Sequence, residues 1–224
     1  MTAGFPLAGL KLLSRLKENN STEWFHSHKE EYRALVQQPM LQLVEQVNAE
    51  LAKFAPAYVT EKKNPLSRPN RDTRFSKDKS PYRTDISAVF PRAGLEKHQA
   101  AGFFLRVHPD GAELIAGSFV PGPDELSSIR RYLDKNHKAF LAVTTARPLI
   151  SAFGALQGDQ LVRVPRGYDP AHPAAALLRA TQFYYRRSLP KPIVTSPSFR
   201  SEIVTSFRAA TPFVEAVDAA FGNT

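Results

Sequence analysis

The sequence contains no cysteine among its 224 residues, and this absence excludes several classes of protein. Without thiols the chain has no disulfide framework, no thiol nucleophile and no zinc site built on thiolates. No apolar run approaches the roughly 20 residues that a membrane-spanning helix needs, so no membrane partner is expected. The N-terminus lacks the basic and apolar regions of a secretory signal, and we expect a soluble, cytoplasmic protein.

The sequence also lacks the motifs of the common catalytic and cofactor-binding sites. It contains no phosphate-binding Walker loop, no nucleophile elbow, no HExxH zinc motif and no dinucleotide-binding GxGxxG. Its six histidines are scattered without the spacing of metal ligands. The histidines therefore predict no metal site, no metal ligand is assigned, and the sequence identifies no cofactor.

Acidic side chains are few relative to basic ones, and the imbalance is local. The chain has 30 Lys and Arg against 21 Asp and Glu, a formal net charge of +9. Residues 62–92 carry nine basic and three acidic side chains, and residues 160–200 carry seven and one. If these two blocks meet in space, they form a strongly positive surface that concentrates anions.

Hydrophobic spacing predicts an α+β fold in a single domain spanning residues 1–224. Apolar residues at helical spacing predict helices over most of residues 1–54 and again from Gly122 to the C-terminus. Between them lie strand-like runs, and Pro109-Asp110-Gly111 predicts the turn of a hairpin over 102–119. The other predicted strands are 86–90, 160–164 and 182–188. This order places helices at both ends and antiparallel strands in the centre.

Several short signals predict where helices begin. Ser21 or Thr22 is positioned to cap a helix, and Pro39 marks either a kink or the first turn of a new helix. Thr211-Pro212 carries the same signal and predicts a further helix start near the C-terminus.

The densest group of ionisable side chains lies in residues 71–84, here called the basic loop. Its candidate ligand-binding residues are Arg71, Arg74, Ser76, Lys77, Lys79, Tyr82 and Arg83. Surplus arginine suits a planar oxyanion, because guanidinium donates two parallel hydrogen bonds to carboxylate or phosphate. Asp72 and Asp78 are candidates for orienting these arginines, for proton transfer or for a magnesium site. The alternative is a charged surface loop, and in both cases Phe75 and Tyr82 are expected to be buried.

A second candidate segment spans residues 165–173. Arg166 and Gly167 favour a close backbone approach to an anion. Asp169 and His172 are three residues apart and form a candidate acid–base pair, although a helix cap by Asp169 explains the same pattern and is favoured. We predict that Arg166 joins Arg71, Arg74 and Lys79 of the basic loop in one concave basic site.

The pattern Arg71-Asp72-x-Arg74-Phe75-Ser76-x-Asp78-Lys79-x-Pro81-Tyr82 resembles the signature segment of a microbial family known as domain of unknown function 2461. The resemblance extends to Asn19-Asn20 with Glu23-Trp24-Phe25, to Gly102-Phe103-Phe104-Leu105 and to the segment 165–173. These motifs span nearly the whole chain, which implies one domain. The family name implies no reaction, substrate or cofactor.

The sequence leaves three possible functions open. The favoured one is an enzyme, or a former enzyme, acting on a small phosphorylated or carboxylated molecule held by the basic loop. The second is a nucleic-acid-binding module, which a sequence pI near 9.9 fits, although the basic residues are concentrated in short segments. The third is a protein-interaction domain whose arginine-rich basic loop binds an acidic partner.

Overall fold

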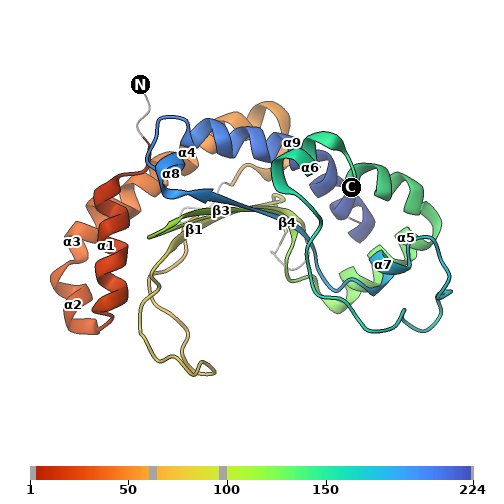
Figure 1. Cartoon of the computed structure of the whole chain (residues 1–224), viewed down its shortest axis with the longest axis horizontal. Helices are drawn as coiled ribbons and strands as arrows, with labels where there is room; N and C mark the ends of the chain where they lie inside the picture. The colour runs from red at the N-terminus through yellow and green to blue at the C-terminus, as the bar shows by residue number, and fades with distance from the viewer. Residues whose placement is uncertain (1–3, 61–64, 96–99, 223–224) are drawn as a thin grey trace.

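A four-stranded antiparallel sheet forms the centre of the protein (Figure 1). The computed structural model describes residues 4–60, 65–95 and 100–222. The strands are β1 (Ile86–Pro91), β2 (Gly102–His108), β3 (Gly111–Ser118) and β4 (Phe183–Pro190), and they lie in sequence order across the sheet. The predicted hairpin over 102–119 is confirmed as β2 and β3, with His108 paired to Gly111 at the turn.

Helices lie on both sides of the strands in the sequence, so the predicted α+β class is confirmed. The longer ones are α1 (Leu7–Glu18), α4 (Gln38–Phe54), α5 (Pro123–Thr144), α6 (Arg147–Phe153) and α9 (Phe199–Phe221). The shorter ones are α2 (Thr22–Ser27), α3 (Lys29–Tyr32), the π-helical turn η1 (Arg33–Gln37), the 3-10 turn η2 (Pro56–Tyr58), α7 (Ala175–Arg179) and α8 (Lys191–Val194). None of these helices is long and apolar enough to cross a bilayer.

One face of the sheet is covered by helices and forms the core. Helix α9 packs on β3, and helices α4, α5 and α6 pack on α9 in turn. Side chains alternate between the two faces of a strand, and most residues on the helix-covered face of the sheet are buried, whereas Arg187 on that face is partly exposed and pairs with Glu202 of α9. The buried residues are Ile86, Ala88, Phe90, Phe103, Leu105, Val107, Ala112, Leu114, Ala116, Phe183, Tyr185 and Leu189.

Local signals account for several helix ends. The hydroxyl of Ser21 accepts a hydrogen bond from the backbone N–H of Trp24 (3.2 Å), so Ser21 is the predicted cap of α2. Pro39 lies in the first turn of α4, directly after the π-helical turn. The backbone stays helical from α3 through η1 into α4, so Pro39 begins no separate helix and instead lies where α-helical geometry resumes after the π-helical turn.

Two predicted features are wrong. Residues 160–164 form no strand: Gln160 makes an isolated bridge with Ala180, and Val162 is exposed. Thr211-Pro212 begins no new helix, because α9 runs through it. Phe207 and Phe213 on either side are fully buried, and each such side chain contributes about 1.5–3 kcal/mol, which together offsets the ~3 kcal/mol cost of an interior proline.

A buried polar contact ties α9 to the segment before the sheet. The hydroxyl of Tyr58 donates to Asp218 over 2.5 Å, and the backbone N–H of Ala101 donates to the other oxygen of Asp218 over 2.6 Å. Both side chains have essentially no exposed surface. Burial and the nearby Asp218 carboxylate raise the pKa of Tyr58, so the phenol stays protonated and continues to donate.

Two long segments extend past the opposite face of the sheet, here called the open face. Residues 65–85 lie beside β1, where Leu66 bridges to Ala88. Residues 154–174 lie beside β4, where Gln157 bridges to Tyr184. Figure 1 shows these two segments on opposite sides of the open face. The open face therefore has a wall at each edge.

Candidate functional site

The open face carries three rows of side chains, set by the strand register. Val89, Phe104, Ile115 and Arg186 are directly opposite one another across β1 to β4. The next row is Ser87, Arg106, Glu113 and Ser188, and the third is Pro91, Gly102, Gly117 and Tyr184. One row is therefore largely apolar, the second is polar and charged, and the third carries almost no bulk at its centre.

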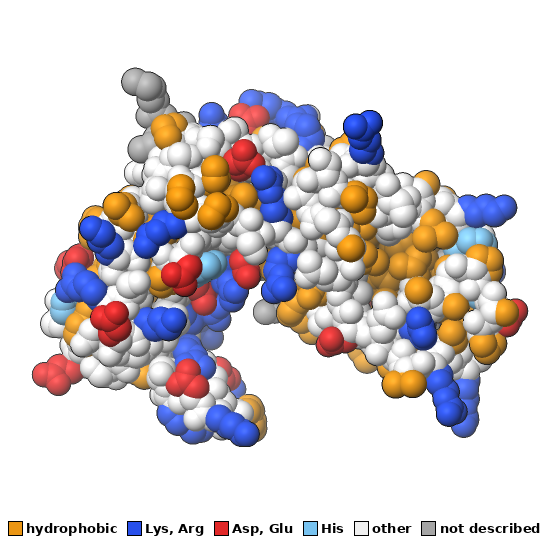
Figure 2. All heavy atoms as spheres, viewed as in Figure 1, with side chains coloured by type: hydrophobic (Ala, Val, Ile, Leu, Met, Phe, Trp, Pro, Cys, Tyr) orange, Lys and Arg blue, Asp and Glu red, His pale blue; other side chains and the backbone are white. Residues whose placement is uncertain are grey.

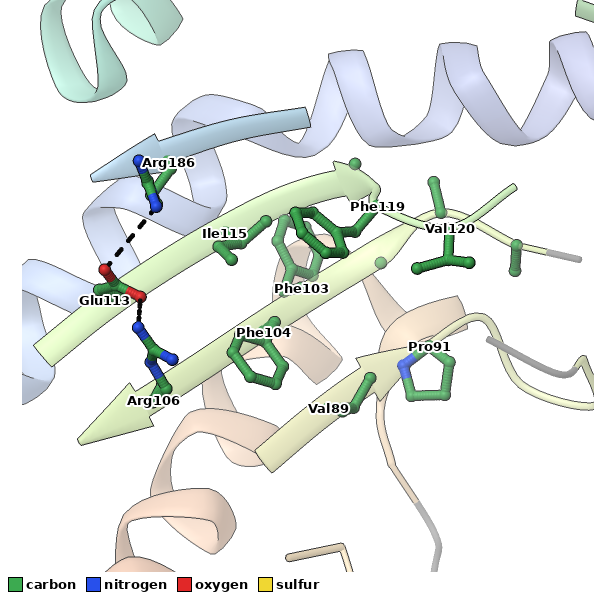
Figure 3. Close-up of a pocket in the computed structure, with 14 residues that line it drawn as sticks. Val89, Pro91, Phe103, Phe104, Arg106, Glu113, Ile115, Phe119, Val120 and Arg186 are labelled. Carbon is green, nitrogen blue, oxygen red and sulfur yellow. Dashed lines mark hydrogen bonds and ion pairs between the residues drawn. The ribbon is translucent and has the colours of Figure 1, made fainter. Parts of the chain in front are cut away.

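These rows, apart from Ser87, Ser188 and Tyr184, line a pocket of about 330 Å³, here called the open-face pocket (Figure 3). Its wall is continued by Phe119 and Val120, which follow β3 and are 48% and 60% exposed. The ring of Phe119 contacts Tyr184 edge-on, with 4.8 Å between ring centroids. Exposed apolar side chains gathered around a concave surface are typical of a site that a ligand covers.

Two glycines give the pocket its depth. Gly102 and Gly117 are paired across β2 and β3 and both line the pocket. A Cβ atom on Gly117 would lie 2.2 Å from the carbonyl oxygen of Phe183, and its φ of +119° disfavours any other residue. A Cβ on Gly102 would lie 2.5 Å from the carbonyl oxygen of Phe90. Close packing of the strands thus requires glycine here, and the floor is left without side chains.

Three charged residues converge at one end of the pocket, as Figure 3 shows. Arg106 donates to Glu113 over 2.5 Å, and Arg186 lies 4.0 Å from the other oxygen of Glu113. Glu113 is the least exposed, with 16% of its side-chain surface accessible, against 35% for Arg106 and 47% for Arg186. Two cations share one carboxylate, so one positive charge is not neutralised.

Arg106 has further capacity to donate. Its Nε is buried and has no hydrogen-bond partner among the described residues. Guanidinium has five N–H donors, and the contact with Glu113 occupies one nitrogen. A buried donor without a partner costs free energy, so an acceptor entering the pocket would be stabilised at this end.

Sequence reasoning missed all three of these charged residues. A usable signal existed for two of them. Arg106 lies two residues before His108 and Glu113 two residues after Gly111, and His108 and Gly111 are the pair that closes the turn, so Arg106 and Glu113 are opposite each other in the hairpin. Arg186 is brought in by the β3–β4 pairing, which no local pattern indicates.

The basic loop is organised around a short two-stranded ladder. Asn70 bridges to Tyr82, and the backbone N–H groups of Arg71 and Arg83 donate to the carbonyls of Pro81 (2.8 Å) and Pro69 (2.7 Å). Tyr82 is buried as predicted and stacks on Phe25 with 4.0 Å between ring centroids. The loop is thus anchored at its base.

Phe75 is not buried, and the expectation that it anchors the loop is wrong. Its side chain is 96% exposed, and the guanidinium of Arg74 lies over the ring at 5.9 Å. Charged contacts hold this end of the loop in place of apolar ones: Arg71 pairs with Asp78, and Lys79 donates to the carbonyl of Thr73 over 2.9 Å. An apolar anchor is therefore not needed at the tip.

The cations of the loop are largely paired with carboxylates nearby in the sequence. Arg74 donates to Asp72 over 2.7 Å and Arg83 to Asp85 over 2.8 Å, besides the pair of Arg71 with Asp78. Ser76 accepts from Arg71 over 3.4 Å. Lys77 has no ion-pair partner among the described residues. Nearby carboxylates thus neutralise most of the positive charge that a count along the sequence assigns to the basic loop.

The two aspartates of the basic loop are held in the ionised form. Hydrogen bonds from the hydroxyl and N–H of Ser80, followed by that from Arg71, lower the pKa of Asp78 to about 2. Hydrogen bonds from the Arg74 side chain and backbone lower the pKa of Asp72. A carboxylate with so low a pKa is a weak general base at neutral pH, so these contacts favour the orienting role over proton transfer.

The segment 165–173 lies on the other side of the open face from the basic loop (Figure 1). Asp169 accepts from the N–H of Ala171 over 2.8 Å and closes a local turn. His172 instead lies 3.9 Å from the carboxylate of Asp134, and its Nδ1 accepts from the N–H of Ala174 over 3.0 Å. The side chains of Asp169 and His172 therefore make different contacts. The predicted helix cap by Asp169 is wrong, because α7 begins at Ala175, directly after Ala174, and has no side-chain cap.

The described residues place the two basic segments apart. Arg71, Asp78, Tyr82 and Arg83 line a pocket of about 440 Å³ beside α1, and Arg166 is not among the residues that line it. Figure 2 shows a notch below the sheet between the two segments, with Lys and Arg side chains along its edge. That Arg166 shares a site with the basic loop stays a prediction, and the residues that line the pocket beside α1 do not support it.

The described part of the chain contains no group of three or more His, Asp or Glu side chains arranged to bind a metal ion. Residues 8–215 match the family described as "Conserved hypothetical protein (DUF2461)", and the chain belongs to that family. The comparisons with curated proteins and with solved structures gave no match.

Proposed function

We propose that this member of the DUF2461 family binds a small amphiphilic anion in the open-face pocket. The ligand would combine an apolar or aromatic body with one carboxylate or phosphate group. The observation that carries the proposal is the sharing of one carboxylate, Glu113, by two arginines at the end of an apolar pocket. The unneutralised cation supplies the attraction for the acid group.

The lining of the pocket supports the division of the ligand into two parts. Phe104, Ile115 and Phe119 offer apolar surface, and Arg106 and Arg186 offer N–H donors at one end. Small-molecule sites typically combine apolar walls with a few convergent polar groups, in volumes upward of about 300 Å³. A volume of about 330 Å³ suits a molecule of roughly a dozen non-hydrogen atoms.

The proposal concerns binding and extends the small-anion hypothesis from the basic loop to the sheet. The candidate catalytic carboxylates Asp72 and Asp78 are engaged by arginine and serine, and Asp169 is engaged in a turn. These contacts support structural roles, so the proposal assigns no reaction to them.

Displacement of a fluorescent probe tests the proposal. 1-Anilinonaphthalene-8-sulfonate has an apolar body and one anionic group, and its emission rises on entering an apolar site. Decanoate and decyl phosphate are expected to displace it at least tenfold more effectively than decanol, because each hydrogen bond to a charged group contributes about 1.5–3 kcal/mol. Equal displacement by decanol would show that the arginines take no part and would overturn the proposal.

A further inference from the structure

We infer that the pocket beside α1 is a second site, which binds a small oxyanion through Lys17, Arg71 and Arg83. The site is separate from the open-face pocket, since the two share no lining residue. Its volume is about 440 Å³, and its other lining residues are polar apart from Tyr82: Asn20, Asp78, Ser80, Thr84 and Asp85.

The three cations come from three places in the sequence and are brought together by one clamp. The side-chain amide of Asn20 donates to the carbonyl of Tyr82 over 2.9 Å and accepts from its N–H over 3.0 Å. Asn20 lies two residues after the end of α1, which carries Lys17 in its last turn. The clamp therefore fixes the end of α1, and with it Lys17, against the ladder that carries the two arginines.

The ladder turns both arginines toward the same side. Asn70 and Tyr82 are opposite each other, and side chains alternate along each strand. Arg71 and Arg83 are each one residue from this pair, so they lie on the face opposite to that of Tyr82. With Tyr82 buried against Phe25, the arginine face is the one that borders the pocket.

Two carboxylates hold the arginines in place without exhausting their donors. Arg83 uses its Nε and one terminal nitrogen on Asp85, over 3.1 and 2.8 Å, and its other terminal nitrogen makes no hydrogen bond within the described residues. Arg71 is held by Asp78 and by the carbonyl of Ser80. Lys17 makes no ion pair in the described part of the chain.

The charges of the pocket point to an anion as its ligand. Three cations and two carboxylates leave one positive charge, and the hydroxyls of Ser80 and Thr84 lie in the same lining. Fixed guanidinium groups with free N–H donors match the oxygens of phosphate or carboxylate. The class of ligand is thus an oxyanion, free or carried as a phosphate group on a larger molecule.

Titration with inorganic phosphate, followed by the backbone amide NMR signals of Arg71, Ser80 and Arg83, tests this inference. We expect a saturable shift at these amides, with the affinity weakened about 3- to 10-fold by Lys17→Gln, because one charged donor is removed. Lys11→Gln is the matched control, because Lys11 is an exposed lysine of the same helix, α1, yet does not line the pocket. It is expected to leave the affinity within about twofold.

Two outcomes would overturn the site: no saturable shift up to about 20 mM phosphate, or equal weakening by Lys17→Gln and Lys11→Gln. Phenyl phosphate distinguishes the sources of the anion, since tighter binding than that of free phosphate assigns the site to a phosphate ester. Binding of decanoate at the open-face pocket is followed at Ile115 instead, so the failure of one site is distinguishable from the failure of the other.

Discussion

The guanidinium of Arg106 donates to the carboxylate of Glu113 over 2.5 Å, across two neighbouring strands and on the face of the sheet that no described helix covers. The pair fixes Glu113 at the end of an apolar pocket, where Arg186 reaches it from a third strand. A carboxylate that already has one close arginine neutralises a second only partly. The proposed affinity for anions follows from this imbalance.

Replacement of Arg186 by glutamine should separate charge recognition from apolar binding. We expect the affinity for decanoate to fall about tenfold or more, because a hydrogen bond to a charged group contributes about 1.5–3 kcal/mol. The affinity for decanol should stay within about twofold. Isothermal titration measures both, and Arg131→Gln serves as the control, because Arg131 contacts Ser127 and Ser128 on α5. An equal loss for both ligands would contradict the assigned role of Arg186.

The dependence of binding on salt should separate a small ligand from a nucleic acid. A ligand with one anionic group is expected to give a slope of log affinity against log salt no steeper than about −1. For a polynucleotide, each phosphate contacted makes the slope of log affinity against log salt more negative by ~0.7–0.9. Labelled DNA and RNA oligonucleotides should bind weakly at ~150 mM salt. Sub-micromolar affinity with a slope steeper than about −4 would make nucleic-acid binding the leading function.

The side chain of Asp78 should titrate near pH 2. Its folded pKa of about 2 lies below the ordinary value of 3.8, so its contribution to the order of the basic loop is complete above about pH 4. That contribution is lost as the pH falls toward 2. Carboxyl ¹³C NMR measures the midpoint, and Ser80→Ala should raise it, because the hydrogen bond from the Ser80 hydroxyl is the largest cause. An unchanged midpoint in that variant would show that the cause lies elsewhere.

Removal of the Tyr58 hydroxyl should weaken the fold. Tyr58→Phe takes a donor from the buried carboxylate of Asp218, and we expect the free energy of unfolding to fall by about 1–3 kcal/mol. Tyr184→Phe is the control, since Tyr184 is half-buried on the open face and its hydroxyl makes no hydrogen bond within the described residues. It should change stability by less than about 0.5 kcal/mol. Urea unfolding followed by circular dichroism measures both, and equal effects would rule out a special role for the contact of Tyr58 with Asp218.

Local features of the fold could be predicted from the sequence because each depends on nearby residues. The cap at Ser21 and the turn at Pro109-Asp110-Gly111 act within a few residues, and both are confirmed. The continuity of α9 through Pro212 could not be predicted, since it depends on burial against the sheet. The propensity of a single residue is weak against the packing of a whole helix face.

The candidate site was harder to predict than the fold, for two physical reasons. Charge counted along the sequence does not reveal pairing, and Arg71 and Arg74 each have an aspartate partner in the basic loop. The pair of Arg106 with Glu113 follows from hairpin register, but Arg186 joins it only through the β3–β4 pairing. Which distant strands pair is decided by the tertiary structure and cannot be predicted from the spacing of residues in the sequence.

The location of bound decanoate is the most direct test of the proposed function. Intermolecular nuclear Overhauser effects should connect the decanoate chain to the methyl groups of Val89, Ile115 and Val120, and the carboxylate end should shift the side-chain signals of Arg106 and Arg186. Contacts confined to other parts of the surface, or no saturable binding of decanoate, would contradict the proposal that the open-face pocket holds an amphiphilic anion.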